Sequence, residues 1–272
     1  MTTLQIALVA SALSFAGPAL LLPSGQAMEL ETEPYSPCLS PEVDSPTFAT
    51  ALQDVADPQA CEQWPGLTPI RPDNPALIWQ DGRVLMVAWT RSCHPDFPDG
   101  LACQSIGDSF NVTGWADSYA LWVTAAPEVK AFLLSASYTP GLTVQTLAER
   151  LGQYLGLLPD GGESRTFVEL WVHPDDLLRP CIDPDPTDTQ CDLWSAETLE
   201  QAPPEFRASV GTAYPFTGLG YTYDWGNPNT EVGASEFVIR AGATVEIAYI
   251  ASTEDYVRGL ILPTTPDGNP ED

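Results

Sequence analysis

Two parts of the chain consist of paired apolar runs separated by a short turn signal. In the first, Asp81-Gly82 divides two β-prone stretches between Ala76 and Thr90. An Asp-Gly pair favours a two-residue hairpin turn, because both turn positions need positive φ. In the second, Ala241-Gly242 separates the apolar stretches 236–239 and 244–250. The pattern therefore predicts one hairpin over 76–90 and another over 236–250.

Apolar residues at helical spacing mark four further segments. Ser45-Pro46 is typical of a helix start, and the helix is expected to run until Pro58. The other helices are expected from Pro127 to Ser137, from the capping residue Thr143 along a leucine stripe to Leu158, and from 203 to 210. Continuous apolar runs predict buried strands over 119–124 and 166–173.

Strands and helices alternate irregularly along the chain, with predicted hairpins near both ends. This order favours an α+β fold with a mixed or mainly antiparallel sheet and helices packed on one face. We expect one disulfide-stapled domain over 45–262. It follows an extended, acidic and Pro-rich stretch over 28–44 and precedes a polar tail over 263–272.

The first 27 residues carry no charged side chain. Ile6 to Leu22 is mainly apolar, and Gly25-Gln26-Ala27 offers the small residues that signal peptidase prefers. We interpret 1–27 as a signal peptide cut after Ala27. The missing basic residue after Met1 departs from that pattern and leaves an uncleaved anchor as the alternative. Cleavage predicts a secreted or periplasmic protein.

Six cysteines behind such a leader predict a disulfide framework. Local pairing is the simplest arrangement, because Cys93 and Cys103 are ten positions apart, as are Cys181 and Cys191. The remaining pair would be Cys38–Cys61. A zinc site is the alternative, but no C-x-x-C pair is present and C-x9-C is an uncommon ligand spacing.

Charge excludes two classes of partner. The chain has 37 acidic and 10 basic residues, which gives a formal net charge of −27. Such a surface repels nucleic acid and anionic lipid. After the leader, no apolar run is long enough to span a bilayer, so we expect no membrane partner once the leader is removed. The acidity also has a simpler interpretation, which is that it keeps an exported protein in solution.

Few residues suggest catalytic chemistry. The sequence contains no G-x-S-x-G elbow, no phosphate-binding Gly loop and no H-E-x-x-H helix. The two histidines, His94 and His173, both precede Pro-Asp. They would bind a metal or act in acid–base catalysis if the fold brought them together. We favour the alternative, in which each is a loop residue held by a nearby Asp.

The loop that Cys181 and Cys191 would close is the candidate cation site. Four carboxylates could offer the hard oxygen ligands that Ca²⁺ prefers, namely Asp183, Asp185, Asp188 and Asp192. The loop lacks the Gly and the terminal Glu of a helix–loop–helix calcium site, and a solvated acidic loop is our preferred interpretation. No other cofactor is predicted.

The Gly-rich aromatic segment from Gly218 to Pro228 is the candidate ligand site. Rings next to Gly and Asn are typical of sugar-stacking surfaces, and a nearby carboxylate can bind hydroxyl groups. The candidates are Tyr221, Tyr223, Asp224, Trp225 and Asn227. The alternative, that these rings pack on the C-terminal hairpin, has equal support.

Residues 220–228 and 235–239, the Glu169–Val172 strand and the acidic cysteine loop together carry a resemblance. They resemble a family of uncharacterised exported bacterial proteins, over approximately Leu121 to Ile250. The resemblance implies a bacterial source and one contiguous domain, and it brings no activity, cofactor or catalytic residue.

Three functions remain open. The first is a non-catalytic exported binding or interaction module for an unknown extracellular or periplasmic ligand, which we prefer to an enzyme. The second is a secreted carboxylate-dependent hydrolase acting on glycans, with Asp224, Glu231 and Glu236 as its acids. The third, least favoured, is a secreted ADP-ribosyltransferase-like toxin, for which the usual Glu-x-Glu pair is missing.

Overall fold

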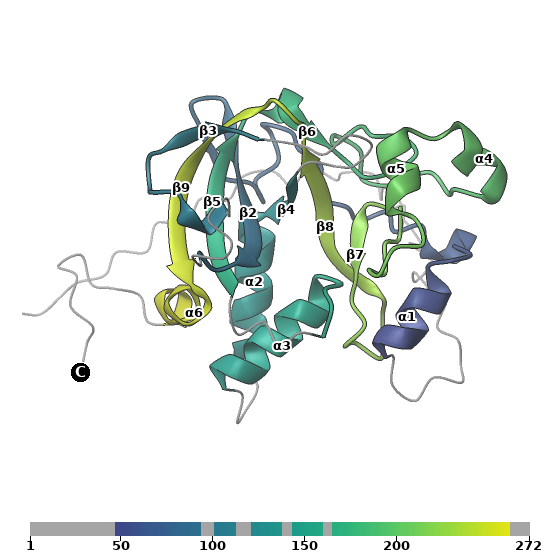
Figure 1. The fold of residues 1–272 in the computed structure, drawn as a ribbon, viewed down its shortest axis with the longest axis horizontal. Coiled ribbons are helices and arrows are strands. Elements are labelled where there is room, and N and C mark those ends of the chain that lie inside the picture. Colours follow the sequence, from purple (N-terminus) through teal and green to yellow (C-terminus); the bar gives the residue numbers. More distant parts are fainter. Residues whose placement is uncertain (1–46, 94–100, 113–120, 138–142, 160–164, 262–272) are drawn as a thin grey trace, which may run out of the picture. The chain divides into compact units, whose positions relative to one another are not determined.

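A strongly curved antiparallel sheet is the main element of the fold (Figure 1). The computed structural model describes residues 47–93, 101–112, 121–137, 143–159 and 165–261. Along the sheet the strands follow the order β3-β9-β5-β2-β4-β8-β6, while β1 pairs with β2 and β7 pairs with β8. The strands are β1 Trp79–Gln80, β2 Arg83–Arg91, β3 Ser109–Asn111, β4 Leu121–Ala125, β5 Arg165–Val172, β6 Leu177–Leu178, β7 Tyr221–Tyr223, β8 Val232–Ile239 and β9 Thr244–Ser252.

The first predicted hairpin is confirmed. Trp79 pairs with Val84 and Gln80 with Arg83, so that Asp81 and Gly82 form the turn. Their φ angles are 50° and 76°, as a two-residue turn of this kind requires. The first strand is shorter than its apolar run, because only two of its residues pair with β2.

The second predicted hairpin is wrong, although both of its strands exist. β8 pairs with β4, β6 and β7, whereas β9 pairs with β3 and β5. The connection between them is bound by other segments, because the Gly242 N–H donates to the Val112 carbonyl and the Arg240 N–H to the Asp176 carbonyl. A local turn motif predicts that the chain changes direction, but the pairing of the strands depends on contacts with distant parts of the chain.

One face of the sheet encloses an apolar cluster contributed by most of its strands. Val84, Met86, Leu170, Phe237 and Val245 are each at most 1% exposed and belong to this cluster. Strand β5 is buried along most of its length, because it lies between β2 and β9 and is covered on both sides.

The other face is covered by the three longer helices, α2 Ala126–Ser137, α3 Val144–Tyr154 and α6 Thr253–Ile261 (Figure 1). Thr143 caps α3 as predicted, through a capping box with Thr146. The predicted leucine stripe extends past the helix, which ends at Tyr154 before Gly156 at φ 64°. The expected α+β class, with an antiparallel sheet and these helices on one face, is therefore confirmed.

A third apolar cluster lies beside β7 and β8, where the chain from Cys181 to Tyr221 packs around the Cys181–Cys191 disulfide. The short helices α4 Ala196–Gln201 and α5 Pro204–Ser209 belong to this region (Figure 1). Gly220 has φ 79°, and a Cβ there would lie 2.8 Å from Arg179 Cδ. The close approach of β7 to the disulfide region therefore requires glycine at this position.

Two of the three predicted disulfides are present, Cys93–Cys103 and Cys181–Cys191. Cys38 lies outside the described residues, so the Cys38–Cys61 pair stays a prediction. The predicted signal peptide over 1–27, the stretches over 28–44 and 263–272, and His94 also lie outside them.

Candidate functional site

The structure places the predicted aromatic segment in and next to β7. Tyr221 and Tyr223 are 1% and 8% exposed. The hydroxyl of Tyr221 donates to the Glu62 carbonyl over 3.0 Å, and that of Tyr223 donates to Asp54 Oδ2 over 2.7 Å. Neither tyrosine is therefore exposed as a sugar-stacking surface would require, and both hydroxyl groups are bound by residues of an N-terminal segment.

Asp224 is also buried, at 2% exposed. Both of its carboxylate oxygens accept hydrogen bonds from the Arg150 guanidinium of α3, over 2.7 and 2.6 Å. Burial raises the pKa of Asp224, and the Arg150 contact works against that rise. The carboxylate therefore joins α3 to the β7–β8 connection.

Trp225 and Asn227 are intermediate in exposure. The Trp225 indole N–H donates to the Leu157 carbonyl over 3.1 Å, and its ring meets Phe48 edge-on at 5.6 Å between centroids. Asn227 Oδ1 accepts the Asn229 N–H over 3.0 Å within the turn. Ligand binding by this segment stays a prediction, but its polar groups already have partners within the protein.

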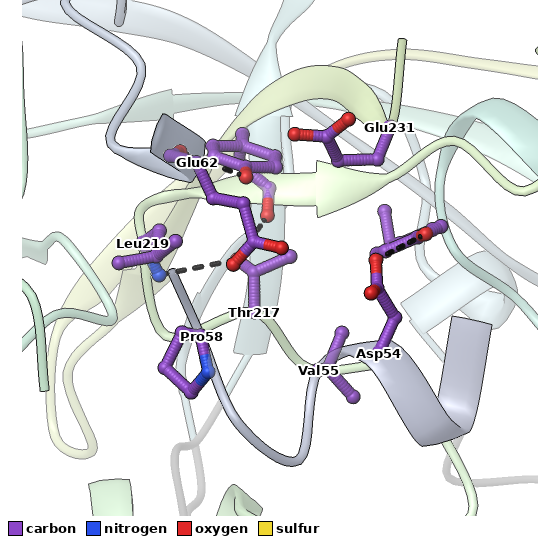
Figure 2. Close-up of a pocket in the computed structure, with 9 residues that line it drawn as sticks. Asp54, Val55, Pro58, Glu62, Thr217, Leu219 and Glu231 are labelled. Atoms are coloured by element: carbon purple, nitrogen blue, oxygen red, sulfur yellow. Dashed lines mark hydrogen bonds between the residues drawn. The ribbon is translucent and has the colours of Figure 1, made fainter. Parts of the chain in front are cut away.

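A small cavity, here called the carboxyl cavity, lies where the N-terminal segment meets β7 (Figure 2). Helix α1 Phe48–Asp54 and the 3-10 turn η1 Ala60–Glu62 form this segment; α1 is capped by Thr47 rather than by the predicted Ser45. Three of the lining side chains are acidic, Asp54, Glu62 and Glu231. The space open to the centre of a water molecule is about 10 Å³, which is enough for about one water.

Burial controls the protonation of the two glutamates. It raises the pKa of Glu62 to about 7, although the Gln59 N–H, which donates to Glu62 Oε2 over 2.6 Å, opposes the rise. Burial also raises the pKa of Glu231, which is 8% exposed. Its Oε1 is buried without a hydrogen-bond partner. The nine residues that line the cavity include no basic side chain.

Glu236 lies apart from these acids, on β8 opposite Thr124 of β4. Burial alone raises its pKa to about 8. Asp224 and Glu231 also lie in different surroundings. Asp224 is bound by Arg150, whereas Glu231, just before β8, lines the carboxyl cavity. The structure thus separates the three carboxylates proposed for a hydrolase into different surroundings and pairs Glu231 with Glu62, which the sequence did not suggest.

The acidic cysteine loop carries exposed carboxylates. Asp185 Oδ1 accepts both the N–H and the hydroxyl of Thr187, contacts that lower the pKa of Asp185. Within the described ranges, no three Asp, Glu, His or Cys side chains are grouped as a metal site, so the Ca²⁺ site stays a prediction. His173 Nδ1 accepts the Asp175 N–H over 3.3 Å and is half-exposed.

A second hollow is an open groove between α2 and α3, with a volume of about 470 Å³. Phe132 lines it and stacks on Tyr154 at 3.8 Å between ring centroids. Its polar lining consists of Ser135, Thr146, Glu149, Arg150 and Gln153. Sequence analysis missed this groove, because hydroxyl and amide groups on the outer face of a helix resemble any solvated surface.

No protein-family model, curated protein or solved structure matches this chain. The resemblance to exported bacterial proteins therefore stays a prediction. Among the helices that the structure describes, none is long and apolar enough to cross a membrane.

Proposed function

We propose that this chain is an exported binding module whose ligand occupies the groove between α2 and α3. The groove carries the proposal, because its volume of about 470 Å³ lies within the range of small-molecule sites, ~300–1,000 Å³. Two disulfides support an oxidising compartment outside the cytoplasm. The apolar leader at 1–27 supports the same location.

The lining of the groove favours a neutral polar ligand such as a sugar unit. Ser135, Thr146 and Gln153 offer both donors and acceptors, as hydroxyl-rich ligands require. The Arg150 guanidinium is fixed by Asp224, and two of its five N–H donors are used there. The net charge of −27 disfavours anionic ligands and nucleic acid.

A glycan array probed with the purified exported chain tests this proposal, followed by calorimetric titration of any sugar that binds. Ser135→Trp fills the groove from an exposed position on α2 and should weaken binding at least about tenfold. Ala131→Trp is the matched control, since Ala131 is exposed on the same helix but does not line the groove. Equal affinity of both variants and the unmodified chain would place the ligand elsewhere.

A carboxylate-dependent hydrolase is the second candidate. It is favoured by the raised pKa of Glu62, about 7, next to Glu231, because a general acid must hold its proton near neutral pH. The cavity as it stands is open to little more than one water, which favours binding over catalysis. Glycan hydrolysis that is lost in Glu231→Gln would reverse this preference.

A further inference from the structure

The N-terminal segment over 47–62, here called the strap, covers β7 through a small number of polar and aromatic contacts. Tyr221 and Tyr223 donate hydrogen bonds to Glu62 and Asp54 of the strap, and Phe48 meets Trp225 edge-on. Ala51 of the strap is fully buried, and just after the strap Gln63 Nε2 donates to the Cys191 carbonyl over 2.9 Å. Two of the contacts with β7, through Asp54 and Glu62, involve residues that line the carboxyl cavity. Its position therefore depends on the surroundings of the carboxyl cavity.

Those surroundings are acidic on both sides. The strap contributes Asp54, Asp57 and Glu62, and the chain before β8 contributes Glu231. Tyr221 and Tyr223 face them from β7. The negative charges of Asp54, Asp57 and Glu231 each disfavour ionisation of Glu62, and Asp54 does the same to Glu231.

Glu231 shows that the cavity lacks a counter-charge. The side chain is 8% exposed, lines the cavity, and leaves Oε1 buried without a hydrogen-bond partner. An ionised carboxylate in this position would be desolvated without compensation, which is costly. A proton on Glu231 or Glu62 removes the charge and supplies an O–H donor to the cavity.

We propose that the strap is a pH-sensitive cover, held over β7 while the carboxyl groups of Glu62 and Glu231 are protonated and released as they ionise, so that Tyr221 and Tyr223 become accessible. The residues uncovered are the two tyrosines that the sequence suggested as a sugar-stacking surface. This second surface is separate from the groove between α2 and α3.

The sign of the effect follows from the direction of the pKa shifts. Burial moves the pKa of Glu62 from 4.5 to about 7 and moves that of Glu231 in the same direction. The folded contact therefore favours the protonated acids. The stabilisation from Glu62 is complete below about pH 4.5 and is lost as the pH rises through about 7, and that from Glu231 is also lost as the pH rises. Closure is favoured by acid and opening by mild alkali.

Hydrogen exchange of the exported chain tests the proposal through the amides of the strap. Protection factors, corrected for the intrinsic rate at each pH, should fall at least about tenfold for the strap between pH 5 and pH 8.5, since one pKa unit corresponds to about a tenfold change in the equilibrium. Protection of β2 and β5 should stay constant, because the opening is local.

Glu62→Gln and Glu231→Gln each keep the side-chain shape and remove one titration, so each should reduce the pH-dependent fall. Glu254→Gln, an exposed acid on α6, is the matched control and should retain it. If the protection factors of the strap amides in the unmodified chain are the same at pH 5 and pH 8.5, the proposal is wrong. An undiminished fall in both Gln variants would also overturn it.

Discussion

At the residue scale, buried polar side chains have their partners within the protein, and one of them was suggested by the sequence as a ligand group. Asp224 is 2% exposed and bound by both terminal nitrogens of Arg150. Arg179, fully buried, donates to the carbonyls of Thr68, Pro186 and Asp188 and lies 4.6 Å from the Phe237 ring. Arg150 and Asp224 are 74 positions apart, and Arg179 and Thr68 are 111 apart, so residue type alone could not predict these contacts.

Replacing Trp225 with Ala should lower the free energy of unfolding by about 3 kcal/mol. The change removes a ring that packs on Phe48 and an N–H that donates to Leu157. Urea denaturation measures the loss. Tyr214→Ala is the control, since Tyr214 is 44% exposed and a surface change of this kind usually costs less than ~0.5 kcal/mol. Equal small losses in both variants would return Trp225 to the role of an exposed recognition residue.

Replacing Glu236 with Gln should change how stability depends on pH. Burial raises the Glu236 pKa from 4.5 to about 8, so the folded state prefers the protonated acid. Its stabilisation is present below about pH 4.5 and is lost as the pH rises through about 8. Gln keeps the neutral shape at every pH.

Thermal melts at pH 5 and pH 9 measure this effect. Glu236→Gln should be similar to the unmodified chain at pH 5 and more stable at pH 9, by about 1–3 kcal/mol. The Glu254→Gln control should lose at most the ~0.3–0.5 kcal/mol of an exposed i,i+4 ion pair, and by the same amount at both pH values. A variant that is less stable at pH 9 would mean that the carboxylate is ionised and stabilised by its surroundings.

At the scale of elements, local signals in the sequence located most strands and helices but not their pairing. Asp81-Gly82 and Thr143 were correctly interpreted because a two-residue turn and a capping box involve neighbours only. The apolar stretches 236–239 and 244–250 were located as strands, yet their pairing with β4 and β5 depends on residues 70 or more positions away. Helices α4 and α6 were missed, although Ser195 caps α4 and prolines follow both helices, at Pro203 and Pro263.

The candidate site was less predictable than the fold for the same reason. Glu231 was identified as an acid to test, but Glu62 and Asp54, which share its cavity, lie far from it in the sequence and carry no motif. The groove between α2 and α3 depends on the packing of two helices that the sequence located separately. A site built from several distant segments cannot be predicted from the residues of any one of them.

Removing the Cys181–Cys191 disulfide should destabilise the region around β7. Replacing both cysteines with Ala is expected to cost roughly 3 kcal/mol through the lost loop constraint. The sulfur atoms also pack within an apolar cluster with Trp194 and Leu219. Hydrogen exchange should therefore show reduced protection of β7 while β2 keeps its own. The double Ala variant at Cys93 and Cys103 is the control, and equal effects of both variants on β7 would contradict this prediction.

At the scale of the whole molecule, the excess of acidic over basic residues dominates the electrostatics. The chain has 37 acids and 10 bases, and several of the bases are already bound to acids, as Arg83 is to Glu246 and Lys130 to Glu169. The remaining carboxylates have few positive neighbours. Folding brings them closer together than they are in the extended chain, so their mutual repulsion opposes the folded state.

The melting temperature should therefore rise with NaCl concentration. At 0.1 M salt the screening length is about 10 Å, and at 1 M it is about 3 Å, which removes most repulsion between separated surface charges. Sulfate stabilises proteins by exclusion from their surface as well as by screening, so a rise that occurs with Na₂SO₄ but not with NaCl would argue against repulsion as the cause. Most of the NaCl effect should appear below about 0.5 M, where screening changes fastest, and a melting temperature independent of NaCl over this range would show that the net charge of −27 is too widely spread to oppose folding.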